Sequence, residues 1–190
     1  MKLAAIVLAA GSSTRFGGDK LSARLKGKPL LHHAIAAARA APVDEVLVVT
    51  RPDLDLGDWE GVPSVRKIPV SSAALSESLK AGVAEAGDVD GALIFLGDMP
   101  LVPPELASML AAHLASNYAV LPRHDGRPGH PVLLSARAFT DVARLQGDEG
   151  AGRLLRQRED VVFEDWPDAS IHLDIDRKAD LERLDKPASG

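Results

Sequence analysis

The chain begins with an apolar run that leads directly into a glycine-containing loop. Residues 3–8 are all apolar and lack helical spacing, and turn residues follow from Gly11 onward. Such a run is typical of a strand that is buried on both faces of a parallel sheet. Parallel strands need crossover connections, which are usually helices, so this run favours an α/β fold.

The alternation of strand and helix continues along the chain. Further strands are expected at residues 46–49, 65–68, 92–96, 118–121 and 171–175, and helices at residues 30–41, 76–86, 104–115 and 178–184. This order predicts a single-domain, three-layer αβα sandwich around a Rossmann-like, mostly parallel sheet, spanning residues 1–185. Residues 186–190 are expected to form a frayed tail. Ligands of such sheets bind beyond the carboxyl ends of the strands, where Gly11 and Gly97 both lie.

Composition excludes several classes of protein. The formal net charge of -5 at pH 7 argues against a nucleic-acid partner, which usually meets a basic surface. The chain has no cysteine, so disulfides, thiolate metal sites and cysteine nucleophiles are excluded. No apolar stretch approaches the roughly 20 residues that span a bilayer, and the N-terminus shows no secretory pattern. We therefore expect a cytoplasmic protein that does not bind membranes.

The loop after the first strand is suited to phosphate. Gly11, Gly17 and Gly18 let the backbone approach a ligand closely, because glycine has no Cβ. Successive backbone N–H groups in such a loop create a concave anion site, and Arg15 and Lys20 add positive charge to it. The alternative is an ordinary glycine-rich connection with solvated charges.

Two well-known phosphate loops do not match these residues. A Walker A loop needs a second glycine five positions after the first, but Phe16 stands five positions beyond Gly11. Its lysine also precedes Ser or Thr, whereas Leu21 follows Lys20. The dinucleotide fingerprint Gly-x-Gly-x-x-Gly fails because Ser13 replaces its second glycine. The loop therefore belongs to another type.

Acidic residues at two strand ends are candidates for a metal site. Asp98 follows the apolar run and precedes Pro100 in a short turn, and magnesium takes oxygen ligands from one or two carboxylates plus nucleotide phosphates. In the alternative, the Asp98 side chain only accepts a backbone N–H of its turn. Asp174 and Asp176 share one side of the expected late strand. Asp176 could also cap the helix at 178–184.

Residues 8–20, Leu-Ala-Ala-Gly-Ser-Ser-Thr-Arg-Phe-Gly-Gly-Asp-Lys, resemble the signature of the MobA-like nucleotidyltransferases. These enzymes transfer a nucleoside monophosphate from a nucleoside triphosphate onto a phosphate-bearing acceptor. The resemblance implies an αβα sandwich of the nucleotide-diphospho-sugar transferase type.

Two acidic segments extend the resemblance. Residues 97–100, Gly-Asp-Met-Pro, match the metal-binding turn of the family. Residues 174–181 resemble its late motif Asp-x-Asp-Thr-Pro-x-Asp-Leu, although Arg177 and Lys178 replace threonine and proline. The resemblance thus implies that Asp98 and the second acid of the late motif, Asp176, hold Mg²⁺.

The resemblance also implies a nucleotide site. Residues 74–82 resemble the element Gly-Leu/Met-Ser-x-Ser-Leu-x-x-Gly, with alanine at its first position, and its first serine, Ser76, could instead be a helix N-cap. Catalytic roles are implied for Arg15, Lys20 and Asp98. The implied nucleotide-binding residues are Leu8, Ala9, Ala10, Gly11, Ser12, Ser13, Arg15, Lys20, Ser76, Ser78 and Asp98.

Ala10 carries the expectation about the base. Family members that use GTP usually have a glycine at this position, whereas Leu8-Ala9-Ala10-Gly11 resembles the members that use CTP. The resemblance therefore implies CTP, among the nucleoside triphosphates, as the preferred donor.

Two glycine-bracketed loops correspond to the family's acceptor elements. They are residues 129–131, Gly-His-Pro, and residues 147–151, Gly-Asp-x-Gly-Ala. The implied acceptor-binding residues are His130, Pro131, Gly147, Asp148 and Gly150, while Arg123, His124 and Arg127 are candidates to hold an acceptor phosphate. A purely structural, hydrogen-bonding role for His130 is the alternative.

The acceptor implied by the family is molybdopterin carrying molybdenum. The product would be the cytosine dinucleotide cofactor, with a molybdenum hydroxylase apo-enzyme as its recipient. Two alternatives remain at this point: a nucleotidyltransferase for a sugar phosphate or another small phosphate acceptor, and a non-catalytic chaperone for the molybdenum cofactor.

Overall fold

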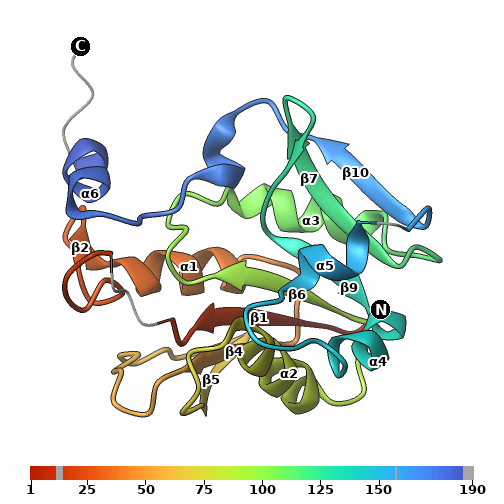
Figure 1. Cartoon of the computed structure of the whole chain (residues 1–190), viewed down its shortest axis with the longest axis horizontal. Helices are drawn as coiled ribbons and strands as arrows, with labels where there is room; N and C mark the ends of the chain where they lie inside the picture. Colours follow the sequence, from red (N-terminus) through yellow and green to blue (C-terminus); the bar gives the residue numbers. More distant parts are fainter. Residues whose placement is uncertain (12–14, 157, 186–190) are drawn as a thin grey trace.

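A computed structural model describes residues 1–11, 15–156 and 158–185 of the chain. Its centre is an eight-stranded sheet with the order β10-β7-β9-β6-β1-β4-β5 and with β8 paired to β7 (Figure 1). The strands are β1 (Leu3–Ala9), β4 (Glu45–Thr50), β5 (Ser64–Pro69), β6 (Gly91–Leu96), β7 (Ala119–His124), β8 (Arg127–Pro128), β9 (Val132–Ser135) and β10 (Val161–Asp165).

Most neighbouring strands of this sheet are parallel. The pairs β1–β4, β1–β6, β4–β5 and β7–β10 are parallel, whereas β9 is antiparallel to both β6 and β7. The mostly parallel, Rossmann-like sheet that the sequence predicts is confirmed. Its antiparallel strand β9 was not among the predicted strands.

Helices cover both faces of the sheet. They are α1 (Leu30–Arg39), α2 (Leu75–Ala86), α3 (Pro104–Ala112), α4 (Phe139–Val142), α5 (Ala151–Leu155) and α6 (Lys178–Asp185). Along β1, Ala5 and Val7 belong to the core beneath α1 and α3, while Ala4 and Ile6 belong to the core beneath α2. A Cβ at Gly82 of α2 would lie 2.5 Å from Ile6 Cγ2, so glycine lets this helix pack directly on β1. The predicted three-layer αβα sandwich is confirmed.

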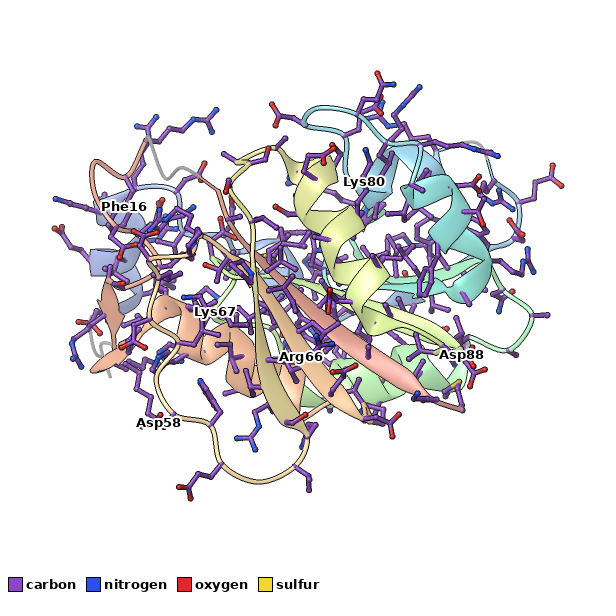
Figure 2. All side chains as sticks on the ribbon, turned by 90° about the horizontal axis from the view of Figure 1, so that it is seen from below. Phe16, Asp58, Arg66, Lys67, Lys80 and Asp88 are labelled. Atoms are coloured by element: carbon purple, nitrogen blue, oxygen red, sulfur yellow. The ribbon has the colours of Figure 1, made fainter. Side chains whose placement is uncertain are left out.

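A third, smaller core lies at one end of the sandwich. Phe16, Leu25, Leu30 and Ile175 form it, and α6 packs against it through Leu181 and Leu184. The hairpin β2 (Arg24–Leu25) and β3 (Lys28–Pro29) lies beside α6 at this end, and Phe16 points into the same region (Figures 1 and 2). This small core ties the segment after the glycine loop to the last helix. Within the described residues, no helix combines the length and hydropathy that crossing a membrane requires.

The late strand predicted at residues 171–175 is wrong. A short 3₁₀ helix, Ala169–His172, is followed by an irregular segment. The Ile171 carbonyl accepts a hydrogen bond from His130 N, and Ile175 N donates one to the Asp98 carbonyl. The two isoleucines also pack into different cores. The alternation of apolar and polar residues at 171–175 therefore arises because the two isoleucines are buried in different places. No strand of the described residues pairs with this segment.

Candidate active site

The carboxyl ends of β1 and β6 bring the glycine loop and the Asp98 turn together. The two strands are neighbours with Leu8 opposite Leu96, and both arrows point toward the end of the molecule that holds α6 (Figure 1). Gly97 N donates a hydrogen bond of 2.9 Å to the Leu8 carbonyl. A Cβ at Gly97 would lie 3.1 Å from Ala9 Cβ, so glycine allows this close approach. Asp98 consequently lies next to the loop.

Four charged side chains meet at this place. The hydrogen bond from Ile175 N to the Asp98 carbonyl, 3.0 Å, brings Asp176 to the same turn. Lys20 Nζ lies 2.7 Å from Asp98 Oδ2 and 3.5 Å from Asp176 Oδ1. Arg15 Nη1 lies 3.1 Å from Asp176 Oδ2. The structure thus brings together the residues that were predicted to bind metal and triphosphate.

Asp176 does not cap helix α6, which was the alternative to a metal-binding role. The N-terminus of α6 is capped by Asp180, whose Oδ2 accepts hydrogen bonds from Asp176 N at 3.2 Å and Arg177 N at 2.8 Å. The Asp176 carboxylate is therefore not required as a cap, and it faces Arg15 and Lys20 instead. The turn-capping alternative for Asp98 fails for a similar reason, because its hydrogen bond comes from Lys20.

The acidic pair fits magnesium better than zinc. The described residues contain no group of three or more His, Cys, Asp or Glu side chains that could hold a metal ion. The Lys20 ammonium nevertheless contacts both carboxylates, which shows that one cation can reach Asp98 and Asp176 together. Zinc sites usually take three or four protein ligands, whereas magnesium takes one or two carboxylates and completes its shell with phosphates and water.

A pocket of about 270 Å³ adjoins this charged group, and we call it the first pocket. Its lining includes seven of the residues predicted to bind nucleotide: Leu8, Ala9, Ala10, Gly11, Lys20, Ser78 and Asp98. Ala10 belongs to this lining and is only 3% exposed, so it is buried at the edge of the pocket. Two further predicted residues, Ser12 and Ser13, lie outside the described residues.

The serines of α2 have different environments. The helix begins at Leu75 with Ala74 as its N-cap, so the expected alternative of Ser76 as N-cap is wrong. Ser76 N donates to the Gly147 carbonyl at 3.1 Å, and its buried Oγ has no hydrogen-bond partner among the described residues. Ser78 lines the first pocket. Direct contact of either serine with a nucleotide remains a prediction. The pocket lining favours Ser78 over Ser76 for this contact.

A second pocket, about 260 Å³, adjoins the first. The two pockets share Leu8, Leu75 and Leu96 in their linings, and the second also includes His130 and Gly150 from the predicted acceptor loops. Its other walls are apolar side chains or small residues: Leu79, Ile94, Leu121, Pro128, Gly129, Val132, Ala151 and Gly152. Pro131, Gly147 and Asp148 belong to the same loops but do not contribute to this lining. Gly147 instead accepts the hydrogen bond from α2.

The sequence and structure have known relatives. Residues 5–161 match the MobA-like NTP transferase domain. The chain belongs to this family. The purine catabolism protein PucB of Bacillus subtilis is 32% identical over 81% of this chain and 80% of its own. A probable molybdenum cofactor guanylyltransferase of Pyrococcus furiosus is 33% identical over 94% of each chain. The crystal structure of an Rv0371c homolog from Mycobacterium sp. strain JC1 has a TM-score of 0.81 and 30% identity, and the match covers 97% of this chain and 96% of that one.

His130 is the ionisable side chain in the lining of the second pocket of this MobA-like chain. Its Nδ1 atom is buried and lacks a hydrogen-bond partner among the residues that the structure describes. Burial lowers the pKa of His130 below its usual value, and the carboxylates of Asp98 and Asp174 oppose this shift in part. The neutral imidazole that burial favours adds a polar side chain without formal charge to the pocket lining.

The candidates for an acceptor phosphate lie elsewhere. Arg123 Nε donates to Asp165 Oδ1 at 2.9 Å, and its guanidinium lies over the Phe163 ring at 5.6 Å. His124 Nδ1 lies 2.9 Å from the Trp166 carbonyl, and Arg127 belongs to the exposed strand β8. Neither pocket includes any of these three side chains in its described lining. Their role in holding the acceptor phosphate stays a prediction, and in the structure Asp165 of β10 and the following Trp166 supply partners for Arg123 and His124.

Sequence reasoning missed the apolar part of the MobA-like site. Leu21, Ala73, Leu75 and Leu96 line the first pocket, and Leu75 forms part of both pockets. A Cβ at Gly150 would lie 2.7 Å from Leu75 Cδ2, so the glycine of the predicted acceptor loop makes room for this side chain. Leucine carries no chemical signal of its own.

Proposed function

We propose that this chain transfers a cytidylyl group from CTP to the phosphate of a molybdopterin-type acceptor and releases pyrophosphate. The observation that carries this proposal is the meeting of Lys20, Asp98 and Asp176 beside two adjoining pockets. The first pocket takes the nucleoside, and the second takes the body of the acceptor. The charged group lies where the phosphates of both substrates would meet.

The reaction needs no nucleophile from the protein. A phosphate oxygen of the acceptor attacks the α-phosphorus of CTP, the bond to the bridging oxygen breaks, and its electron pair leaves with pyrophosphate. Lys20 and Arg15 neutralise the charge that develops on the leaving phosphates, and binding in two pockets holds the reactants in line. Asp98 and Asp176 would hold Mg²⁺, which supplies further charge neutralisation when bound.

The lining of the first pocket supports CTP as the donor. Ala10 is a buried residue of the pocket lining, and a methyl group at this position would leave less space for a purine than a glycine would. The guanylyltransferase relatives favour the competing assignment, guanylyl transfer from GTP to the same acceptor. A direct comparison of the two nucleotides separates these assignments.

The lining of the second pocket supports a flat, heterocyclic acceptor. A polyol such as the body of a sugar phosphate buries several hydroxyl groups, and each one needs a hydrogen-bond partner. The second pocket offers one polar side chain, His130, among leucines, small residues and glycines. A ring system can instead place its faces against apolar walls and its edge toward His130. The finished dinucleotide would then pass to a molybdenum hydroxylase apo-enzyme.

Pyrophosphate release tests the proposal. The purified protein is mixed with Mg²⁺, with CTP or GTP, and with molybdopterin, a sugar phosphate or methylerythritol phosphate. We expect release with molybdopterin, and faster release with CTP than with GTP. Faster release with GTP would assign a guanylyltransferase, and release only with a sugar or alcohol phosphate would assign another acceptor. If no acceptor gives pyrophosphate while the finished cofactor binds tightly, the protein is a chaperone.

A further inference from the structure

We propose that Lys20 closes the metal site of the nucleotide-free protein by acting as an internal counter-ion. In this state its ammonium group holds Asp98 and Asp176, and the triphosphate of an arriving nucleotide draws it away. Metal and nucleotide then bind together, each strengthening the binding of the other. This inference rests on the proposed function, because it takes these two carboxylates as the metal ligands.

The position of the ammonium group is the first support. Lys20 Nζ lies 2.7 Å from Asp98 Oδ2 and 3.5 Å from Asp176 Oδ1, and the side chain is only 10% exposed. Magnesium must lie about 2.0–2.1 Å from its oxygen ligands. A metal that bridges these two carboxylates would therefore need the space that the ammonium group fills. The lysine and the metal would therefore compete for Asp98 Oδ2 and Asp176 Oδ1.

The charge balance of the group is the second support. Arg15 Nη1 also contacts Asp176, at 3.1 Å, so two cationic side chains already neutralise two carboxylates. A divalent ion that entered alone would bring like charges close together in a partly buried place, where electrostatic repulsion is stronger than in water. A triphosphate changes this balance because it offers several anionic oxygens. Lys20 and Arg15 can then pair with phosphate and leave the carboxylates to the metal.

The chain around Lys20 suits a side chain that moves while its backbone stays in place. The Lys20 carbonyl accepts a hydrogen bond from Ala23 N, and the Leu21 carbonyl accepts one from Leu31 N at the start of α1. The flexible four-carbon stem of lysine lets the ammonium group swing without these bonds breaking. The first pocket, in which Lys20 and Asp98 both lie, is where the nucleotide would meet the ammonium group.

Coupling of this kind is reciprocal, so removal of the counter-ion has an unusual consequence. A substitution that weakens binding of the triphosphate should strengthen binding of the metal to the free protein. Lys20→Met keeps an unbranched side chain that is one heavy atom shorter and removes its charge. We expect Lys20→Met to bind Mn²⁺ about 5-fold to 150-fold more tightly than the wild type when no nucleotide is present, which is the usual range of coupling between two ligands.

The experiment measures Mn²⁺ binding to the nucleotide-free proteins from the electron paramagnetic resonance signal of unbound Mn²⁺. Lys28→Met is the matched control, because Lys28 is exposed on the β2–β3 hairpin and the net charge changes equally. We expect this control to bind Mn²⁺ like the wild type. We expect the double variant Lys20→Met/Asp98→Asn to lose the increase in Mn²⁺ affinity. This loss would show that Mn²⁺ binds at Asp98 in Lys20→Met.

A Lys20→Met protein whose Mn²⁺ affinity equals or falls below that of Lys28→Met overturns the inference, and so does a gain that survives Asp98→Asn. Lys20→Gln serves as a second variant, because it keeps a hydrogen-bond donor without the charge. The thermal midpoint gives an independent readout, since Mn²⁺ should raise it more in either Lys20 variant than in the control. Pyrophosphate release by the wild type does not depend on these results, so the proposed function fails or stands separately.

Discussion

In the first pocket, Lys20 and Asp98 place charge at the carboxyl ends of two parallel strands, whereas the second pocket is apolar except for His130. The difference follows from the strands that build each pocket. The loop after β1 and the turn after β6 leave the sheet at the same edge, so polar side chains from both must meet there. The second pocket lies beside β8 and the antiparallel strand β9, and leucines and glycines form most of its walls.

The two pockets should therefore differ in their tolerance for substitution. Beside the first pocket, Lys20 pairs with Asp98 and Asp176, so loss of one charge leaves its partners without a close counter-ion. In the second pocket the walls are mostly apolar, so we expect shape to select the ligand and each single substitution to have a smaller effect. Substitutions in the first pocket should therefore mainly lower turnover. Substitutions in the second pocket should mainly change which acceptor is used or the stability of the fold.

The largest effect is expected for Asp98→Asn. The amide keeps the size of the side chain but loses the charge that pairs with Lys20 and would hold the metal. We expect kcat to fall by about 10²-fold to 10³-fold or more, as for other groups that stabilise transition-state charge. Steady-state pyrophosphate release at saturating Mg²⁺ measures this. Asp58→Asn, at an exposed carboxylate that lines neither pocket, is the control and should retain near-normal turnover. Near-normal turnover of Asp98→Asn would remove this residue from the mechanism.

Lys20→Ala should lower kcat by about 10²-fold, because charge builds on the phosphates as pyrophosphate leaves. Loss of uniform binding would raise KM and leave kcat intact. Kinetics with CTP varied at saturating acceptor distinguish the two results. Arg24→Ala, which removes an exposed charge from the β2–β3 hairpin, should change neither constant. An unchanged kcat for Lys20→Ala would make Lys20 a binding residue only.

Ala10→Gly tests whether the first pocket reads the base by shape. The change removes one buried methyl group from the wall, so we expect it to admit more GTP and to shift the CTP to GTP ratio of kcat/KM by about 10-fold to 200-fold at most. Ala73→Gly is a comparison at an exposed residue of the same pocket, and we expect a smaller shift. A wild type that uses CTP and GTP equally would contradict the assignment of Ala10.

Much of the first pocket and its charged group could be predicted from sequence because the sequence signals are local. The apolar run before Gly11 and the run before Asp98 both indicate buried parallel strands, and such strands place their carboxyl ends at one edge. The position of Asp176 was predictable only as a motif. Its expected strand is wrong, since single hydrogen bonds to the Asp98 turn and the small core around Phe16 hold the segment.

The second pocket was less predictable because its structure depends on contacts between residues that are far apart in the sequence. Arg123 has the charge to hold a phosphate, but its partner Asp165 lies on β10, and nothing in the local sequence shows this pairing. Leu75 reaches both pockets only because Gly150 gives it room. Side chains without chemical character carry no motif, so their role appears only once the strands and loops are placed.

The smallest effect concerns His130 and separates its structural role from a binding role. Burial lowers its pKa, although the Ile94 carbonyl and the carboxylates of Asp98 and Asp174 oppose this, and His172 adds to the lowering. The unfolded chain therefore binds a proton more readily than the folded protein as pH falls below about 6.5, so the folded state loses stability there and keeps it above that pH. We expect the thermal midpoint of the wild type to fall between about pH 7.5 and about pH 5.5, and to fall less in His130→Gln. His113→Gln, which removes an exposed imidazole, should keep the wild-type loss. If the thermal midpoint of His130→Gln falls as much as that of the wild type over this pH range, the His130 imidazole does not cause the loss of stability in acid.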